Sequence, residues 1–128
     1  MNFDYIHKNF QELTEEIQSL SENQGRKITL VAVTKSGDDD ELCALAEAGA
    51  INIGENRPGE LRRRGDLLAE KGFSPILHEI GNLQRNKVKL IIESVGLIHS
   101  LDNIALAKEI DKHAGKVGRC VPVLIEIN

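Results

Sequence analysis

Thr29-Leu-Val-Ala-Val-Thr-Lys35-Ser-Gly37 is an apolar stretch that delivers a single lysine where the chain leaves a predicted β-strand. Residues 29–33 are β-branched or aliphatic apart from one alanine, which is typical of a strand buried on both faces of a parallel sheet. Parallel α/β sheets carry their functional groups at the carboxyl ends of the strands, where a desolvated lysine can attack carbonyl groups. Taken alone, the stretch favours a simpler interpretation, a solvated lysine that ends a strand, because lysines are mostly exposed.

The rest of the chain repeats this unit at a regular spacing. Strand-like runs begin near Ile28, Ile51, Pro75, Gly96 and Val121, so that successive starts lie 23, 24, 21 and 25 residues apart. Helical patterns separate these runs. Alternating strands and helices at this spacing predict parallel strands joined by right-handed crossovers.

A helix is predicted before the first strand, over residues 1–25. Apolar residues recur there at spacings of three and four, which places them on one stripe of an amphipathic helix: Phe3, Ile6, Phe10, Leu13, Ile17 and Leu20. Four later helices are predicted from their caps and breakers. The first begins with Asp38–Asp40, the second begins at Pro58, the third covers about 84–94, and the fourth opens at Asp102 as N-cap and ends at Gly115.

The number of units leaves two architectures open. Five units occupy residues 28–128, whereas a closed (β/α)8 barrel of TIM type needs eight units and typically ~250 residues. The chain is therefore either a five-stranded open sheet of flavodoxin type or the first part of a barrel. Periodicity alone does not separate these two architectures.

Composition limits the classes of function. The chain has 128 residues, of which 41% are hydrophobic and 28% charged, as expected of one soluble domain. A net charge of −4 argues against a nucleic-acid partner. No signal peptide or membrane span is predicted, so we expect a cytoplasmic protein with no membrane partner. The basic run Arg62–Arg64 is expected to be a solvated helix face.

Polar residues follow each predicted strand. Collected on one rim, they would surround Lys35 with amide and hydroxyl groups and few carboxylates; the candidates are Asn56, Gly81, Ser100 and Asn128. Such a rim suits a polar aromatic aldehyde bound as an imine better than it suits hydrolysis. The chain has no Gly-rich phosphate loop after the first strand, and its four histidines lack the spacing of metal ligands.

Ordered blocks of sequence carry a family resemblance over nearly the whole chain. The blocks are Val31-Ala-Val-Thr-Lys35, Gly54-Glu-Asn-Arg57 with Glu60-Leu61, His78-x-Ile-Gly-x-Leu-Gln-x-Asn-Lys87, and Ile98-His-Ser-Leu-Asp102. Together they resemble the pyridoxal-phosphate homeostasis proteins, which are single-domain relatives of the alanine racemase barrel. Where family members often have a second lysine and a proline after the lysine motif, this chain has Ser36-Gly37-Asp38.

The resemblance implies a fold and a function. It implies a (β/α)8 barrel in which Lys35 holds pyridoxal 5′-phosphate (PLP) as an internal aldimine. Asn56 is then a nearby polar contact, and Gly81, Ser100 and Asn128 are further cofactor-binding positions on the rim. Such proteins buffer the cofactor or deliver it to PLP-dependent apo-enzymes, with no catalytic turnover expected.

The length of the chain modifies this expectation. Residues 1–128 are expected to form a single partial barrel domain that lacks the last three units, which in barrels commonly supply the phosphate site. We therefore expect this chain alone to bind PLP weakly or not at all unless a second chain completes the barrel, and we expect self-association through the open sheet edge. Two alternatives remain open: a racemase-like PLP enzyme of fold type III, and an α/β interaction module without a cofactor.

Overall fold

A five-stranded parallel sheet forms the centre of the computed structural model, which describes residues 2–34 and 36–127. The strands are β1 (Val31–Val33), β2 (Asn52–Glu55), β3 (Ile76–Glu79), β4 (Val95–Leu101) and β5 (Val123–Ile125). Every neighbouring pair is parallel, and the strand order is β1-β2-β3-β4-β5. Four of the five strands begin within two residues of the predicted positions.

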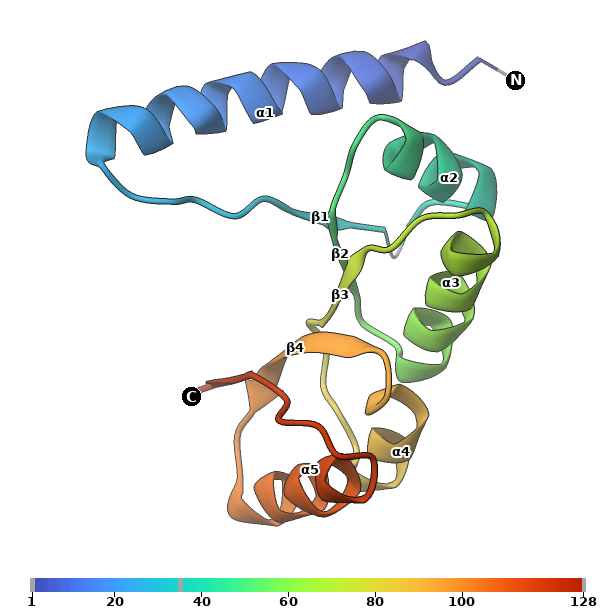
Figure 1. Ribbon diagram of the computed structural model, residues 1–128, viewed down its shortest axis with the longest axis vertical. Helices are drawn as coiled ribbons and strands as arrows, with labels where there is room; N and C mark the ends of the chain where they lie inside the picture. Colours follow the sequence, from blue (N-terminus) through green and yellow to red (C-terminus); the bar gives the residue numbers. More distant parts are fainter. Residues whose placement is uncertain (1, 35, 128) are drawn as a thin grey trace.

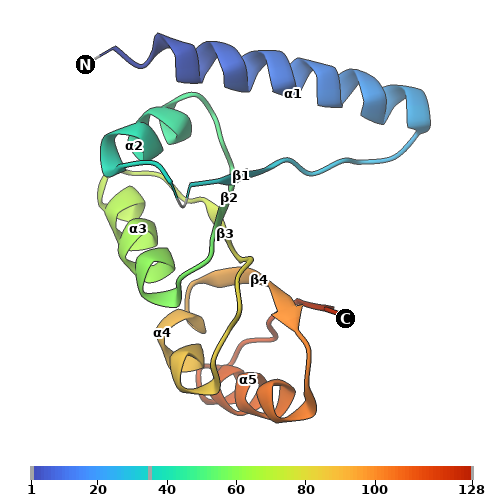
Figure 2. The same cartoon turned by 180° about the vertical axis from the view of Figure 1, so that it is seen from behind.

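The placement of the helices, together with the strand order, differs from that of a flavodoxin-type sheet (Figure 1). They are α1 (Asp4–Gln24), α2 (Asp39–Glu47), α3 (Pro58–Glu70), α4 (Val88–Ile91) and α5 (Ile104–Lys116), with a 3-10 turn η1 (Arg85–Lys87) before α4. Figures 1 and 2 show α2 to α5 along one side of the sheet, while α1 runs across the end that carries α2. A flavodoxin-type sheet has the order 2-1-3-4-5 and helices on both faces. The observed sequential order is that of consecutive units of a (β/α) barrel.

The first strand is shorter and more exposed than predicted. β1 has three residues, whereas the sequence predicts a strand over residues 28–34, and Val33 is 49% exposed. The prediction of a strand buried on both faces was wrong because β1 is an edge strand, which pairs with β2 alone among the described strands. A β-branched run reports the tendency to form a strand but not the position of that strand in the sheet.

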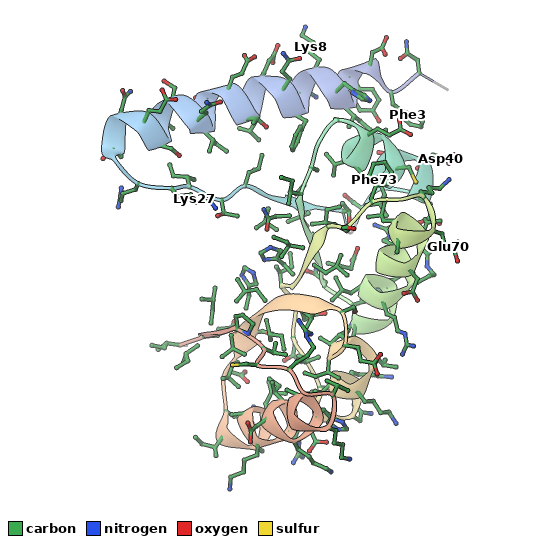
Figure 3. All side chains as sticks on the ribbon, viewed as in Figure 1. Phe3, Lys8, Lys27, Asp40, Glu70 and Phe73 are labelled. Carbon is green, nitrogen blue, oxygen red and sulfur yellow. The ribbon has the colours of Figure 1, made fainter. Side chains whose placement is uncertain are left out.

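Helix α1 forms as its apolar stripe predicts, and Gly25 ends it with a left-handed φ of 62°. Its first turns face α2, where Gly49 lies close to the ring of Phe10. In Figure 3, Phe3 lies on the side of α1 that faces α2, and Lys8 points away from it. Further along the stripe, Leu13 and Leu20 are 45% and 47% exposed.

The N-cap of α2 is the predicted residue, whereas that of α5 is not. The Asp38 side chain accepts a hydrogen bond of 2.8 Å from the Glu41 amide and caps α2, as predicted. For α5, however, the N-cap is Asn103, whose side chain accepts from the Leu106 amide at 2.8 Å. The prediction of Asp102 as this cap was wrong by one residue; Asp102 instead accepts a bond from the Asn103 side-chain amide.

Two apolar clusters fill the space between sheet and helices. The larger joins α3, α4 and α5 to β3 and β4 around Leu61, Ile91 and Ile98. The smaller joins α2 and α3 to β2 around Leu42, Ile53 and Leu68, and Phe73 packs against it (Figure 3).

No helix within residues 2–34 and 36–127 combines the length and the apolar character needed to cross a membrane.

Candidate functional site

The turns at the carboxyl ends of β2 and β3 bring two of the predicted site residues together. Asn56 follows β2 and Gly81 follows β3. A Cβ atom placed on Gly81 would lie 2.5 Å from the Asn56 carbonyl oxygen and 2.9 Å from the Asn56 Cα. Only glycine therefore allows these two turns to meet.

The other predicted site residues do not join this contact. Ser100 lies inside β4 instead of after it, and only 4% of the residue is exposed. Its Oγ has no hydrogen-bond partner among the described residues. Lys35 and Asn128 lie outside the described residues.

Beneath these turns, two buried carboxyl groups lie side by side. Glu55 and Glu79 end β2 and β3, pair in register, and are 3% and 0% exposed. Side chains alternate along a strand, so each points to the same face as the core residue two positions earlier, Ile53 and Leu77, which packs against the helices. These two glutamates support the rim from the helix side, and the expectation of few carboxylates around Lys35 stays a prediction, because Lys35 lies outside the described residues.

Each glutamate holds the turn that follows its own strand. Glu55 Oε1 accepts a bond of 3.2 Å from the Asn56 amide, and Glu79 Oε1 accepts a bond of 3.0 Å from the Gly81 amide. Burial raises the pKa of the Glu79 carboxyl to about 8; the Gly81 amide opposes this change and the nearby Glu55 adds to it. Glu79 is therefore largely a neutral acid at pH 7.

The third charged group of this buried layer is Arg64 of α3. The prediction of a solvated helix face for Arg62–Arg64 was wrong for this residue, which is 8% exposed. Its Nη1 donates to the Thr34 carbonyl and, at 3.2 Å, to Glu55 Oε2. Its Nη2 donates to the Gly37 carbonyl at 2.5 Å. Arg64 thus bridges the turn after β1 and the carboxylate that ends β2.

On the opposite face of the sheet, which we call the inner face, a polar chain crosses three strands. His78 Nε2 of β3 lies 2.9 Å from Asn52 Oδ1 of β2. His78 Nδ1 lies 2.9 Å from His99 Nε2 of β4. Because the Asn52 oxygen accepts, His78 carries its proton on Nε2 and accepts from His99. Burial, and then the charge of His99, lower the pKa of His78, which favours this neutral form.

The sequence did not predict that Glu55, Glu79 and Arg64 form one buried layer, or that His78 and His99 pair on the inner face. One signal was present: in a strand of period two, Glu55 and Glu79 share the parity of the apolar residues Ile53 and Leu77. A charged residue at a core-facing position implies a buried partner. The identity of that partner depends on contacts between distant segments, which the pattern does not contain.

The chain is similar in sequence and in fold to known proteins. No family model matches the chain. It is 37% identical over 117 residues to the pyridoxal phosphate homeostasis protein of Aquifex aeolicus, a match that covers 89% of this chain and 50% of that protein. The chain thus spans about half the length of the curated relatives it matches.

Two solved structures share the fold. PipY of Synechococcus elongatus, with PLP bound, superposes with a TM-score of 0.72 at 27% identity, over 88% of this chain and 54% of PipY. An unknown protein from Bifidobacterium adolescentis superposes with a TM-score of 0.78 at 34% identity, over 93% of this chain and 53% of that protein. By sequence the chain is similar to curated pyridoxal phosphate homeostasis proteins, and by fold it is similar to PipY, in each case over about half of the other protein's length.

Proposed function

We propose that this chain binds PLP through Lys35 and takes part in intracellular cofactor homeostasis without catalytic turnover. The observation that carries the proposal is the similarity to PipY, whose structure holds PLP. The names of the curated relatives support a role in homeostasis. Since the match covers about half of each relative, the function of the whole relative is transferred here as a proposal.

The residues of the rim fit such a ligand. PLP supplies an aldehyde, with which a lysine amine condenses reversibly and releases water. The turns of Asn56 and Gly81 meet at the carboxyl ends of β2 and β3 and offer backbone groups and one side-chain amide. The inner face adds the polar chain of His78 and the half-exposed Val33 at the end of β1. A mixture of apolar surface and a few polar groups suits a polar aromatic ring.

We assign the other predicted contacts as part of the same proposal. Asn56 acts as a polar contact of the cofactor, and Gly81, Ser100 and Asn128 as further binding positions. The contact between Asn56 and Gly81 supports placing these two residues in one site. The buried Ser100 reaches the cofactor only if the end of β4 opens toward the rim.

We further propose that residues 1–128 form one domain that corresponds to about five of the eight units of a (β/α)8 barrel. The sequential parallel order supports this assignment. Apolar side chains are exposed on or next to the sheet, among them Val33, Ile76 and Ile125. Covering them by another chain would stabilise the fold, and we expect self-association for this reason. PLP-dependent apo-enzymes are the proposed recipients of the cofactor.

A spectroscopic titration tests PLP binding. The chain is mixed with PLP, and the visible absorbance of a lysine-bound cofactor is recorded for the wild type and for Lys35→Arg, with PipY as positive control. We expect the band in the wild type and its loss in Lys35→Arg. A wild type without the band, under conditions where PipY shows it, would contradict the proposal. Racemisation of a free amino acid by the loaded chain would contradict the proposed absence of turnover.

A further inference from the structure

We propose that Arg64 is a positioning residue, which holds the backbone turn that carries Lys35 and so sets the rate at which the lysine amine captures the cofactor aldehyde. This inference rests on the proposed function and adds to it a residue outside the matched sequence motifs. Arg62 and Arg63 precede Arg64 on α3, yet both are exposed, and only the third arginine of the run is buried.

The contacts of Arg64 converge on the two ends of one turn. The Gly37 amide donates to the Thr34 carbonyl at 3.1 Å, which brings the two ends of the segment between these residues together. Arg64 donates from Nη1 to the Thr34 carbonyl and from Nη2 to the Gly37 carbonyl. The two ends of the planar guanidinium group therefore fix the residues on either side of the turn, a geometry that a lysine ammonium cannot reproduce.

Glu55 makes the arrangement rigid. Its Oε2 accepts from Arg64 Nη1 at 3.2 Å and from the Thr34 hydroxyl at 3.3 Å. Arg64 Nε lies within 3.6 Å of Glu60 Oε2 and 3.8 Å of Asp39 Oδ1. Three carboxylates thus offset the buried positive charge, as a buried arginine requires.

The other side of the turn is loosely packed. Ser36 and Gly37 border a hollow of 210 Å³ that they share with Ile6 of α1 and Leu45 of α2. Arg64 therefore adds to the bonds that Thr34 makes with Gly54 and Glu55, and it holds the Gly37 carbonyl from the packed side of the segment. Holding a nucleophile in place can supply a large part of a rate, and a displacement of about 1 Å can cost on the order of 100-fold.

The chain offers a matched control for this hypothesis. Arg119 also donates to two backbone carbonyls, those of Ile92 and Val95 at 2.5 and 2.9 Å, but at the opposite end of β4 from the rim. Arg119→Met should therefore remove a comparable structural arginine and leave the turn after β1 intact. Arg62→Met serves as the surface control.

The test combines two measurements on the full chain. The first is amide hydrogen exchange of residues 34–38. The second is the rate at which the absorbance band of lysine-bound PLP appears after mixing. For Arg64→Met we expect faster exchange confined to the turn and bond formation slower by roughly tenfold or more. Arg119→Met and Arg62→Met should retain the wild-type exchange in the turn and the wild-type rate. Arg64→Lys should also form the bond slowly, because lysine keeps the positive charge but lacks the planar guanidinium group that reaches both carbonyls.

Each other outcome has a definite meaning. Unchanged exchange in Arg64→Met, equal slowing in Arg119→Met, or wild-type behaviour of Arg64→Lys would overturn the proposal. A wild type that forms no bond with PLP would refute the proposed function instead, and the exchange data would still decide whether Arg64 holds the turn.

Discussion

Two neighbouring carboxyl groups beneath the rim differ in their partners. Glu55 lies 3.2 Å from the Arg64 guanidinium, whereas Glu79 makes no ion pair with any described residue. The only hydrogen bond to the Glu79 carboxyl from the described residues comes from the Gly81 amide, and its second oxygen is buried without a partner. Burial of an unpaired carboxylate is costly, so the neutral acid is the stable form.

The Glu79 carboxyl should make the stability of the fold depend on pH. Its folded-state pKa of about 8 lies above the usual glutamate pKa of 4.5, so the folded chain binds more protons than the unfolded chain between these values. The free energy of unfolding should therefore fall as the pH rises from 6 to 9. Glu79→Gln should remove most of this fall, on the order of 3 kcal/mol. Urea unfolding at both pH values measures it, with the exposed Glu70→Gln as control. Parallel profiles for wild type and Glu79→Gln would contradict this assignment.

A second residue-scale prediction concerns Gly81. Its Cα faces the Asn56 backbone so closely that a methyl group must push the two turns apart. Gly81→Ala should destabilise the fold by about 1–3 kcal/mol, as overpacking does. Gly59→Ala, whose Cβ would meet nothing within 4 Å, should cost nothing or stabilise α3. Chemical unfolding measures the free energy of unfolding of both variants. An equal loss in Gly81→Ala and Gly59→Ala would contradict the close contact.

Single residues also show where the sequence is silent. Arg62, Arg63 and Arg64 are identical in type and adjacent in sequence, but only Arg64 points between β1 and β2. Helical rotation separates the three side chains by about 100° each, which follows from the 3.6-residue period. Which of the three faces a buried carboxylate depends on how α3 packs on the sheet, and that information lies outside the local pattern.

At the scale of elements, local chemistry predicted most boundaries. The Asp38 cap, Pro58 at the start of α3 and the glycine that ends α1 all act as the sequence indicates. The predicted helix over 84–94 becomes a 3-10 turn and a single turn of α-helix, α4. Its apolar residues Val88, Ile91 and Ile92 are nevertheless buried as expected, so the apolar face of this segment packs into the core although the helix is short.

The start of α5 gives an element-scale prediction with a built-in control. Asn103→Ala should destabilise the chain by about 1 kcal/mol, because the Leu106 amide loses its partner. Asp102→Ala should change stability by less than about 0.5 kcal/mol, since among the described residues this exposed side chain accepts from Asn103 alone. Thermal or urea unfolding compares the two variants. A larger loss for Asp102→Ala would restore Asp102 as the cap.

At the scale of the whole molecule, spacing predicted parallel crossovers but not the strand order. Both a flavodoxin-type sheet and a barrel segment satisfy strands that begin every 21–25 residues. The order β1-β2-β3-β4-β5 depends on the side to which each helix packs. In Figure 1, α2 to α5 follow the same side of the sheet from one end to the other, which is how a singly wound sheet forms.

The open edge of this sheet should cause self-association. β5 pairs with β4 on one side, and its Leu124 and Ile125 are 48% and 74% exposed. Sedimentation velocity should show association that increases with concentration, and Ile125→Glu should weaken it because charge on an edge opposes pairing. Ile104→Glu changes an isoleucine of similar exposure, 72%, at the start of α5, and should leave association unchanged. A monomeric wild type would contradict this expectation.

The central claim is that Lys35 is the residue that captures PLP, and covalent mapping tests it most directly. The chain is incubated with PLP, reduced with borohydride, digested and analysed by mass spectrometry, with PipY treated in parallel. We predict a phosphopyridoxyl group on the peptide that contains Lys35, in clear excess over the exposed Lys8 and Lys27, which Figure 3 shows on α1 and on the segment after it. Equal labelling of all three lysines, or no labelling where PipY is labelled, would contradict the claim.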